Sequence, residues 1–183
     1  MKSDDFPRIF MRIYNGIDYE LVDILHLQPE QISIHGIAHA LSRLCRFGGN
    51  LDEHYSVAQH SVLVSQLLEK IDPPAALWGL MHDAAEAYLV DLPSPIKRIL
   101  PQYEKYENKI LDDLGLHFRL GKMSRSVKAA DRAVCYREQT CLQHVPEFYF
   151  PASSLVAPII TPISAIEAEI MFLRQYLKLR RET

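Results

Sequence analysis

Apolar residues recur three and four positions apart in six segments of this chain, which begin near Ile34, Ser56, Leu77, Tyr103, Ser124 and Ser164. This spacing is typical of one face of a helix, whereas a half-buried strand would alternate apolar and polar residues. An amphipathic helix buries its apolar face against another element of the same core. The chain is therefore predicted to form an all-α domain in which helices cover one another.

Proline and glycine signals separate these predicted helices. Gly48-Gly49 follows the first helix, and Asp72-Pro73-Pro74 breaks the second. The third helix is predicted to continue through Tyr88 and to end before the two prolines of Asp91-Leu92-Pro93-Ser94-Pro95. Gly115 is predicted to close the fourth helix.

The last helix is predicted over 164–180, because Ser164-Ala165-Ile166-Glu167 has the spacing of a capping box. Its inner side is predicted to carry Ile166, Ile170, Leu173 and Leu177. The preceding stretch, 146–162, contains four prolines and no helical period. We expect it to be an extended loop on the surface.

The N-terminal segment has a different pattern. Apolar and polar residues alternate on both sides of Asn15-Gly16, a strong hairpin turn signal. A small β-hairpin appendage is therefore predicted over 1–28. No repeat or linker divides the chain, so the prediction is a single domain over 1–183.

Composition limits the class of partner. The chain has 23 acidic and 20 basic residues and a formal net charge of −3, so no strong positive field attracts a nucleic-acid polymer. No stretch approaches the ~20 apolar residues of a membrane span. The three cysteines include no CxxC pair, which disfavours a disulfide framework and a thiolate zinc site. A reducing, cytoplasmic location is expected.

Imidazole and carboxylate groups suit divalent metals where thiolates are absent. The candidates are His60, His82, Asp83 and Asp131. In a regular helix the neighbours His82 and Asp83 would project about 100° apart, so their spacing alone does not make them co-ligands. Glu86 would lie on the flank that both share.

These residues bring the chain close to a known family. The order His60, His82-Asp83, Asp131 resembles the H…HD…D signature of the HD-domain metal-dependent phosphohydrolases. The segments Tyr55–Ser61, His82–Glu86 and Asp91–Lys97 resemble the bacterial 5′-deoxynucleotidase branch, and Ile37–Phe47 is similar to phage dATP triphosphohydrolases. The resemblance extends from Ile34 to Asp131.

The resemblance implies an HD-type helical bundle and a role for each matching residue. His60, His82, Asp83 and Asp131 would bind one divalent ion, which could be Mn, Co, Fe, Zn or Mg. Glu86 and Asp91 would be catalytic, whereas Arg46, Phe47 and Lys97 would contact a small nucleotide substrate. Outside the family pattern, Arg46 could belong to a solvated helix face and Phe47 could be a hydrophobic cap.

Several functions remain open at this stage. The enzyme could remove the phosphate of a (deoxy)nucleoside 5′-monophosphate or the polyphosphate of a triphosphate. A non-catalytic, nucleotide-binding regulatory domain is the alternative. Hydrolysis of a cyclic or signalling nucleotide is a third possibility, for which no additional histidine pattern is evident. Homo-oligomers occur in the family, and the segment 146–162 could form an interface arm.

Overall fold

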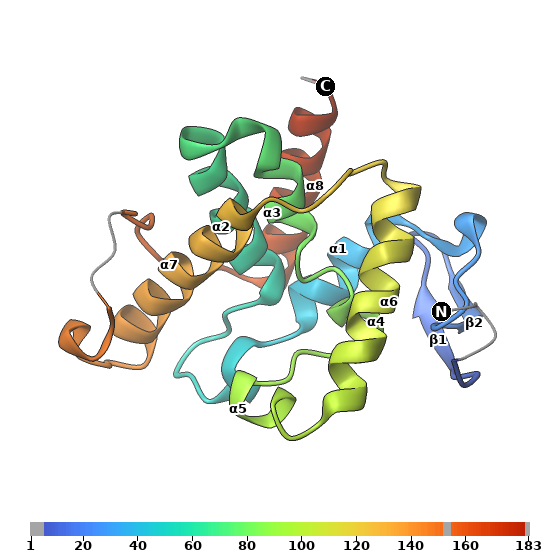
Figure 1. The fold of residues 1–183 in the computed structure, drawn as a ribbon, viewed down its shortest axis with the longest axis horizontal. Coiled ribbons are helices and arrows are strands. Elements are labelled where there is room, and N and C mark those ends of the chain that lie inside the picture. The colour runs from blue at the N-terminus through green and yellow to red at the C-terminus, as the bar shows by residue number, and fades with distance from the viewer. Residues whose placement is uncertain (1–5, 152–154, 182–183) are drawn as a thin grey trace.

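Helix α2 (Val57–Ile71) is the element around which the other helices pack in this computed structural model, which describes residues 6–151 and 155–181. It contacts α1 (Ile34–Arg43), α3 (Ala76–Met81), α7 (Arg125–Leu142) and α8 (Ala165–Arg181), as Figure 1 shows. Neighbours on several sides bury even the polar residues of its first two turns. The core of the molecule therefore lies along α2.

The remaining elements are short, apart from one long helix at the side of the bundle. Helices α4 (Glu86–Leu89) and α5 (Ser94–Lys97) lead into the long α6 (Pro101–His117). Single 3₁₀ turns occur at Pro29–Gln31, Arg46–Gly49, Pro73–Ala75 and Glu147–Tyr149. The predicted mostly helical fold is confirmed for the described residues.

Several predicted helix ends are confirmed by their capping contacts. The Ser56 hydroxyl accepts a hydrogen bond from the Gln59 N–H at the start of α2, and Ser124 caps α7 in the same way. The capping box at the start of α8 is present, because Ser164 and Glu167 exchange side-chain and backbone hydrogen bonds. The break at Asp72-Pro73-Pro74 separates α2 from α3 as predicted.

The prediction of one helix through Tyr88 is wrong. Helix α3 ends at Met81, and α4 begins only at Glu86. Between them the hydrogen bonds join residues three apart, from the Ala84 N–H to the Met81 carbonyl and from the Glu86 N–H to the Asp83 carbonyl. The backbone is therefore wound more tightly where His82 and Asp83 lie.

The prediction that Gly115 ends a helix is also wrong, because α6 continues to His117. A Cβ atom at Gly115 would lie 3.2 Å from Cζ2 of Trp78, so the glycine lets α6 approach the indole ring of α3. The helix ends instead near Arg119, whose φ of 52° is left-handed. Gly115 therefore allows α6 to pack closely on α3 and does not end the helix.

The prediction for the inner face of α8 is wrong for three of its four residues, whereas Leu173 is partly buried and packs against the core. The buried residues are Ala168, Phe172, Gln175 and Leu179. Ile166, Ile170 and Leu177 are exposed, at 65%, 44% and 54%. Both sets have helical spacing, and the helix is turned so that the face with Phe172 packs on α1, α2 and α3.

The predicted hairpin is confirmed as β1 (Phe10–Tyr14) and β2 (Tyr19–Asp23), paired antiparallel. Its turn is longer than Asn15-Gly16 and spans four residues, closed by a hydrogen bond from the Asn15 N–H to the Asp18 carbonyl. Residues that follow the hairpin, including Ile24 and Leu25, are buried in the main core. Residues 1–5 of the predicted appendage lie outside the described residues.

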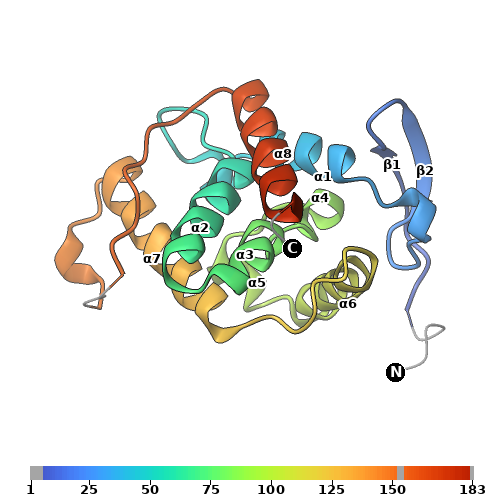
Figure 2. The same cartoon turned by 90° about the horizontal axis from the view of Figure 1, so that it is seen from above.

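The described residues of the segment 146–162 are irregular as predicted, except for the 3₁₀ turn at Glu147–Tyr149. Its residues 152–154 lie outside the described part. Figures 1 and 2 place this segment and the hairpin at opposite ends of the bundle. Within residues 6–151 and 155–181, no helix combines the length and apolar composition that crossing a membrane requires.

Candidate metal centre and cleft

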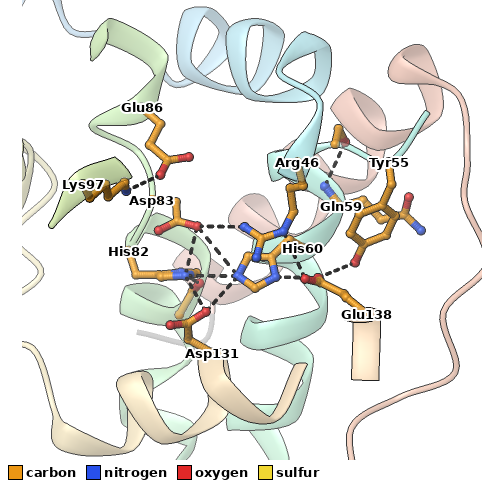
Figure 3. A network of polar contacts seen from close by, with 12 residues as sticks. Arg46, Tyr55, Gln59, His60, His82, Asp83, Glu86, Lys97, Asp131 and Glu138 are labelled. Atoms are coloured by element: carbon orange, nitrogen blue, oxygen red, sulfur yellow. Dashed lines mark hydrogen bonds and ion pairs between the residues drawn. The ribbon is translucent and has the colours of Figure 1, made fainter. Parts of the chain in front are cut away.

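Three of the four predicted metal ligands come from three different elements and meet at one point. His60 lies on α2, His82 directly follows α3, and Asp131 lies on α7. The two imidazole Nε2 atoms are 3.3 Å apart. Oδ1 of Asp131 lies 3.2 Å from Nε2 of His60. One ligand atom from each residue lies within 4.8 Å of the others, so this cluster could hold a metal ion (Figure 3).

Asp83, the fourth predicted ligand, lies beside this cluster. Its Oδ2 is 3.3 Å from Nε2 of His82 and 3.7 Å from Nε2 of His60. The expectation that neighbours in a helix point apart does not apply to the tips of these side chains. The tightly wound turn after Met81 brings His82 and Asp83 to the same point.

Hydrogen bonds that Nδ1 donates orient both imidazoles. Nδ1 of His60 lies 2.6 Å from Oε1 of Glu138, and Nδ1 of His82 lies 2.7 Å from the carbonyl of Gly79. A carbonyl and a carboxylate can only accept, so each Nδ1 carries a proton. In the neutral tautomer, Nε2 then presents its lone pair to the cluster, as a metal ligand must.

The charges at this point favour a cation. Burial lowers the pKa of His82, but the charge and hydrogen bond of Asp83 outweigh burial and raise it to about 9. Burial raises the pKa of Asp83, and the nearby His82, His60 and Arg46 outweigh it and lower the pKa. The two carboxylates therefore favour positive charge at this point, which the protonated imidazoles supply when no ion is bound. A divalent ion would take the place of these protons, because two neutral imidazoles and two carboxylates form a donor set that fits it.

Glu138 is a buried member of the site that the sequence analysis missed. It is fully buried on α7 and accepts hydrogen bonds from Nδ1 of His60 and from the Tyr55 hydroxyl, at 2.6 and 2.7 Å. Its other oxygen accepts from Nε of Arg46 at 3.0 Å. Glu138 therefore sets the orientation of a metal-ligand candidate without reaching the cleft itself.

A signal for Glu138 was present in the helical spacing. It lies four residues after Val134 and seven after Asp131, which places all three on nearly the same side of α7. An acidic residue at a position that continues an apolar stripe is rarely buried without a partner. The stripe therefore indicated a buried carboxylate, although not which side chain it would contact.

A cleft of about 650 Å³ opens above the metal-ligand candidates. Asp83 and Asp131 reach it, while His60 and His82 lie behind them. The cleft also brings together every other residue predicted for the site, namely Arg46, Phe47, Glu86, Asp91 and Lys97. These residues come from the 3₁₀ turn after α1, from α4, from α5 and from the loop between the two helices.

Glu86 is buried at the side of the cleft. Oε1 accepts a hydrogen bond from Nζ of Lys97 at 2.8 Å. Oε2 has no hydrogen-bond partner among the described residues. Burial, followed by the charges of Asp83 and Asp91, raises the pKa of Glu86 well above its ordinary value, although Lys97 opposes the shift. The raised pKa makes Glu86 easier to protonate than an ordinary glutamate.

The predicted phosphate contacts are already engaged with acidic groups. Nζ of Lys97 lies 2.8 Å from Glu86 and 2.7 Å from Glu107. Arg46 is buried between Glu138 and Asp83, with Nη1 3.6 Å from the latter. The guanidinium lies 5.4 Å from the ring centre of Phe47, whose φ of 56° is left-handed. Arg46 therefore does not lie on a solvated face.

Comparison with known proteins shows relatives without an assigned activity. No protein-family model matches the chain. The uncharacterized protein YfdR of Escherichia coli K12 is 46% identical over 108 residues, which cover 57% of this chain and 58% of YfdR. The uncharacterized protein RCAP_rcc00048 of Rhodobacter capsulatus is 32% identical over 136 residues, or 68% of each chain. The match to YfdR thus covers less than two thirds of that protein.

Proposed function

We propose that this chain, which belongs to the family of the Rhodobacter capsulatus protein RCAP_rcc00048, is a metal-dependent phosphohydrolase of the HD type that acts on nucleotides. The observation that carries the proposal is the convergence of two imidazole lone pairs and two carboxylates beneath one cleft. The cleft volume of about 650 Å³ falls in the range of small-molecule sites.

His60, His82, Asp83 and Asp131 would hold the ion. A divalent cation held there would lower the pKa of a water molecule and offset the charge of a phosphate group. Hydrolysis then requires a bond from the water oxygen to phosphorus, cleavage of the bond from phosphorus to the leaving oxygen, and proton transfer to that leaving oxygen. The protein must therefore supply an acid close to the phosphate.

Glu86 is the best candidate for that acid. Its raised pKa favours the protonated form that a general acid needs, and its Oε2, which has no partner among the described residues, leaves one oxygen for a reacting group. Lys97 holds the other oxygen and so acts as a positioning residue for Glu86. Asp91, whose pKa is also raised by burial, lines the same cleft and would orient water or the sugar.

Arg46 would bind the phosphate with the donors that Glu138 leaves free. A guanidinium has five N–H donors in a planar fork, and Nε alone is used in the hydrogen bond to Glu138. Since Glu138 anchors one edge of the fork, the other edge is held toward Asp83 and the cleft. This placement supports a role for Arg46 in substrate binding.

A substrate panel tests the proposal. The purified chain would be stripped of metal and assayed with dAMP, dATP and the matching ribonucleotides, with Mn²⁺, Co²⁺, Fe²⁺, Zn²⁺ or Mg²⁺ added singly. We expect release of phosphate from the monophosphate or of a polyphosphate from the triphosphate with at least one of these ions. An absence of turnover for every pair would contradict the enzymatic proposal.

Two variants separate metal binding from chemistry. Glu86→Gln should keep the bound metal and lose most of the turnover, because the proton donor is removed while the ligands remain. His82→Ala should lose both together. Glu104→Gln, an exposed glutamate of α6, is the matched control and should change neither. Metal content by mass spectrometry and kcat provide the two measurements.

The alternative of a non-catalytic, nucleotide-binding regulatory domain predicts a different outcome. A nucleotide would then raise the melting temperature of the protein without being hydrolysed. The homo-oligomeric state and the cytoplasmic location stay predictions, and light scattering after size-exclusion chromatography tests the former.

A further inference from the structure

The cleft extends away from the metal-ligand candidates along helix α7. One wall of the cleft is α7, which contributes Asp131, Cys135, Tyr136 and Gln139 among others. A helix rises about 1.5 Å per residue, so Gln139 lies about 12 Å along the axis from Asp131. A nucleotide carries its phosphate at one end and its base at the other. If the phosphate lies near Asp131, the base points along α7.

Tyr136 contributes an aromatic ring to the wall of the cleft, and a second aromatic ring packs against it. Its ring stacks on Phe150 with 4.7 Å between ring centres and 17° between planes. It lines the cleft and also a second cavity of about 510 Å³, which lies between α7 and the segment that follows it. Phe150 lines the second cavity and does not line the cleft, so the ring that packs on Tyr136 leaves the cleft itself open.

Gln139 lies one turn farther along the same wall and offers an unused amide. Its side chain makes no hydrogen bond to the residues that the structure describes. Its backbone carbonyl accepts hydrogen bonds from the N–H groups of Gln143 and Val145, which fixes the end of α7. These bonds fix the backbone at position 139, and the side-chain amide at the cleft remains available to a ligand.

We propose that Tyr136 and Gln139 form a nucleobase subsite that selects adenine nucleotides, an inference that rests on the proposed nucleotide chemistry of the same cleft. The base would stack on Tyr136, since base–aromatic stacking tolerates any base. The amide of Gln139 would read the base edge, because its donor and acceptor complement N7 and the N6 amino group of adenine. Guanine offers two acceptors at the equivalent edge and fits less well.

The decisive experiment compares a substrate with and without its base. The ratio of kcat/KM for dAMP to that for 2-deoxyribose 5-phosphate isolates the base, because the reacting phosphate ester is the same in both. We expect Tyr136→Leu and Gln139→Leu each to lower this ratio about tenfold. Gln139→Leu should also remove the preference for dAMP over dGMP. Unchanged ratios in both variants would overturn the subsite.

Matched controls lie close by. Tyr149→Leu removes an exposed aromatic ring from the same segment as Phe150, and Gln102→Leu removes an exposed amide on α6. Neither residue lines the cleft, so both variants should keep the wild-type ratio. Tyr136→Phe retains the ring and should also keep it. If Tyr136→Leu does not fold by circular dichroism, Gln139→Leu decides the question.

A binding measurement distinguishes failure of the subsite from failure of the proposed function. Deoxyadenosine has no phosphate, and its binding can be followed by saturation-transfer NMR without metal or turnover. Binding by the wild type that is lost in Gln139→Leu supports the subsite even if no nucleotide is hydrolysed. Hydrolysis of nucleotides together with equal turnover of 2-deoxyribose 5-phosphate by the wild type would overturn the subsite and leave the enzyme proposal standing.

Discussion

Glu138 is a carboxylate that stays charged although it is buried in the core. Burial raises the pKa of its carboxyl, but Arg46 and His60, with hydrogen bonds from His60 and Tyr55, outweigh burial and lower the pKa to about 2. It therefore stays ionised at neutral pH inside the core. Its charge balances Arg46, and its position holds the imidazole of His60 with Nε2 toward the cluster (Figure 3).

Replacement of Glu138 by glutamine keeps the shape of the side chain and removes this charge. Because hydrogen-bonding partners behind metal-ligating histidines tune affinity, we expect Glu138→Gln to weaken binding of Mn²⁺ or Co²⁺ about 10- to 100-fold. Isothermal titration of the metal-free protein measures the change. Tyr55→Phe, which removes one hydrogen bond to Glu138 but no charge, should have a smaller effect. Equal metal affinity in wild type and Glu138→Gln would show that Glu138 does not support the centre.

At the scale of elements, α8 has two apolar faces, and only one of them is buried in the core. Phe172 is fully buried, whereas Ile170 is 44% exposed. The chosen face also carries Gln175, whose amide donates to the Ser65 hydroxyl and to Glu69 of α2, each at 3.0 Å. The face of Ile170 has no comparable polar anchor among the described residues.

Truncation of each face should therefore have different effects on stability. Phe172→Ala leaves a cavity in the core and should lower the free energy of unfolding by about 3–5 kcal/mol. Ile170→Ala, at a partly solvated position, should lower it by less than about 1 kcal/mol. Urea unfolding followed by circular dichroism compares the two. Losses of equal size would mean that the buried face of α8 has been identified incorrectly.

The contact of α8 with Glu69 should depend on pH. Burial raises the pKa of Glu69, but hydrogen bonds from Lys178 and Gln175 outweigh burial and lower it. Since the folded pKa lies below the unfolded one, this stabilisation is fully present above the ordinary glutamate value of about 4.3 and is lost as the pH falls through the lower folded pKa. Lys178 is 52% exposed, so the contribution should stay below about 1 kcal/mol.

A comparison of wild type with Glu69→Gln between pH 6 and pH 3 isolates this contribution. The wild type should lose more of its free energy of unfolding than the variant over this range, because the variant has no carboxyl group at position 69 to protonate. The difference should disappear in high salt, where partly exposed charges are screened. A wild-type loss that the variant reproduces would assign the acid sensitivity to other groups.

At the scale of the whole molecule, the metal-ligand candidates join three elements of the bundle. His60, His82 and Asp131 lie on α2, after α3 and on α7, so an ion between them would tie the centre of the fold together. Such an ion cannot bind the unfolded chain with the same geometry. Binding energy at this point is therefore also folding energy.

The melting temperature should consequently respond to metal. We expect Mn²⁺ or Co²⁺ to raise it and EDTA to lower it, with a gain of about 2.7 kcal/mol when the free ion is present at 100 times its dissociation constant. Asp131→Asn should reduce the response, and Asp113→Asn, which alters an acid paired with Lys109 on α6, should preserve it. Differential scanning calorimetry provides the measurement. An equal response in the wild type and Asp131→Asn would place the ion elsewhere.

The sequence by itself determined the features that depend on neighbours a few residues apart. Caps such as Ser56 and Ser164, the proline break after Asp72 and the turn at Asn15 all act within four residues of the chain. The alternation of helical segments and breaks therefore predicted an all-α chain with a hairpin. The spaced order of His60, His82-Asp83 and Asp131 indicated which side chains to look for in one site.

Only the tertiary structure decided what these elements contact. Gly115 had the residue type of a helix end and proved to make room for Trp78. Which apolar face of α8 is buried, and the contact of Glu138 with His60 across 78 positions of the chain, depend on partners that lie far apart in sequence. Local backbone preferences cannot encode such pairs, because burial and ion pairing are decided only when the helices pack.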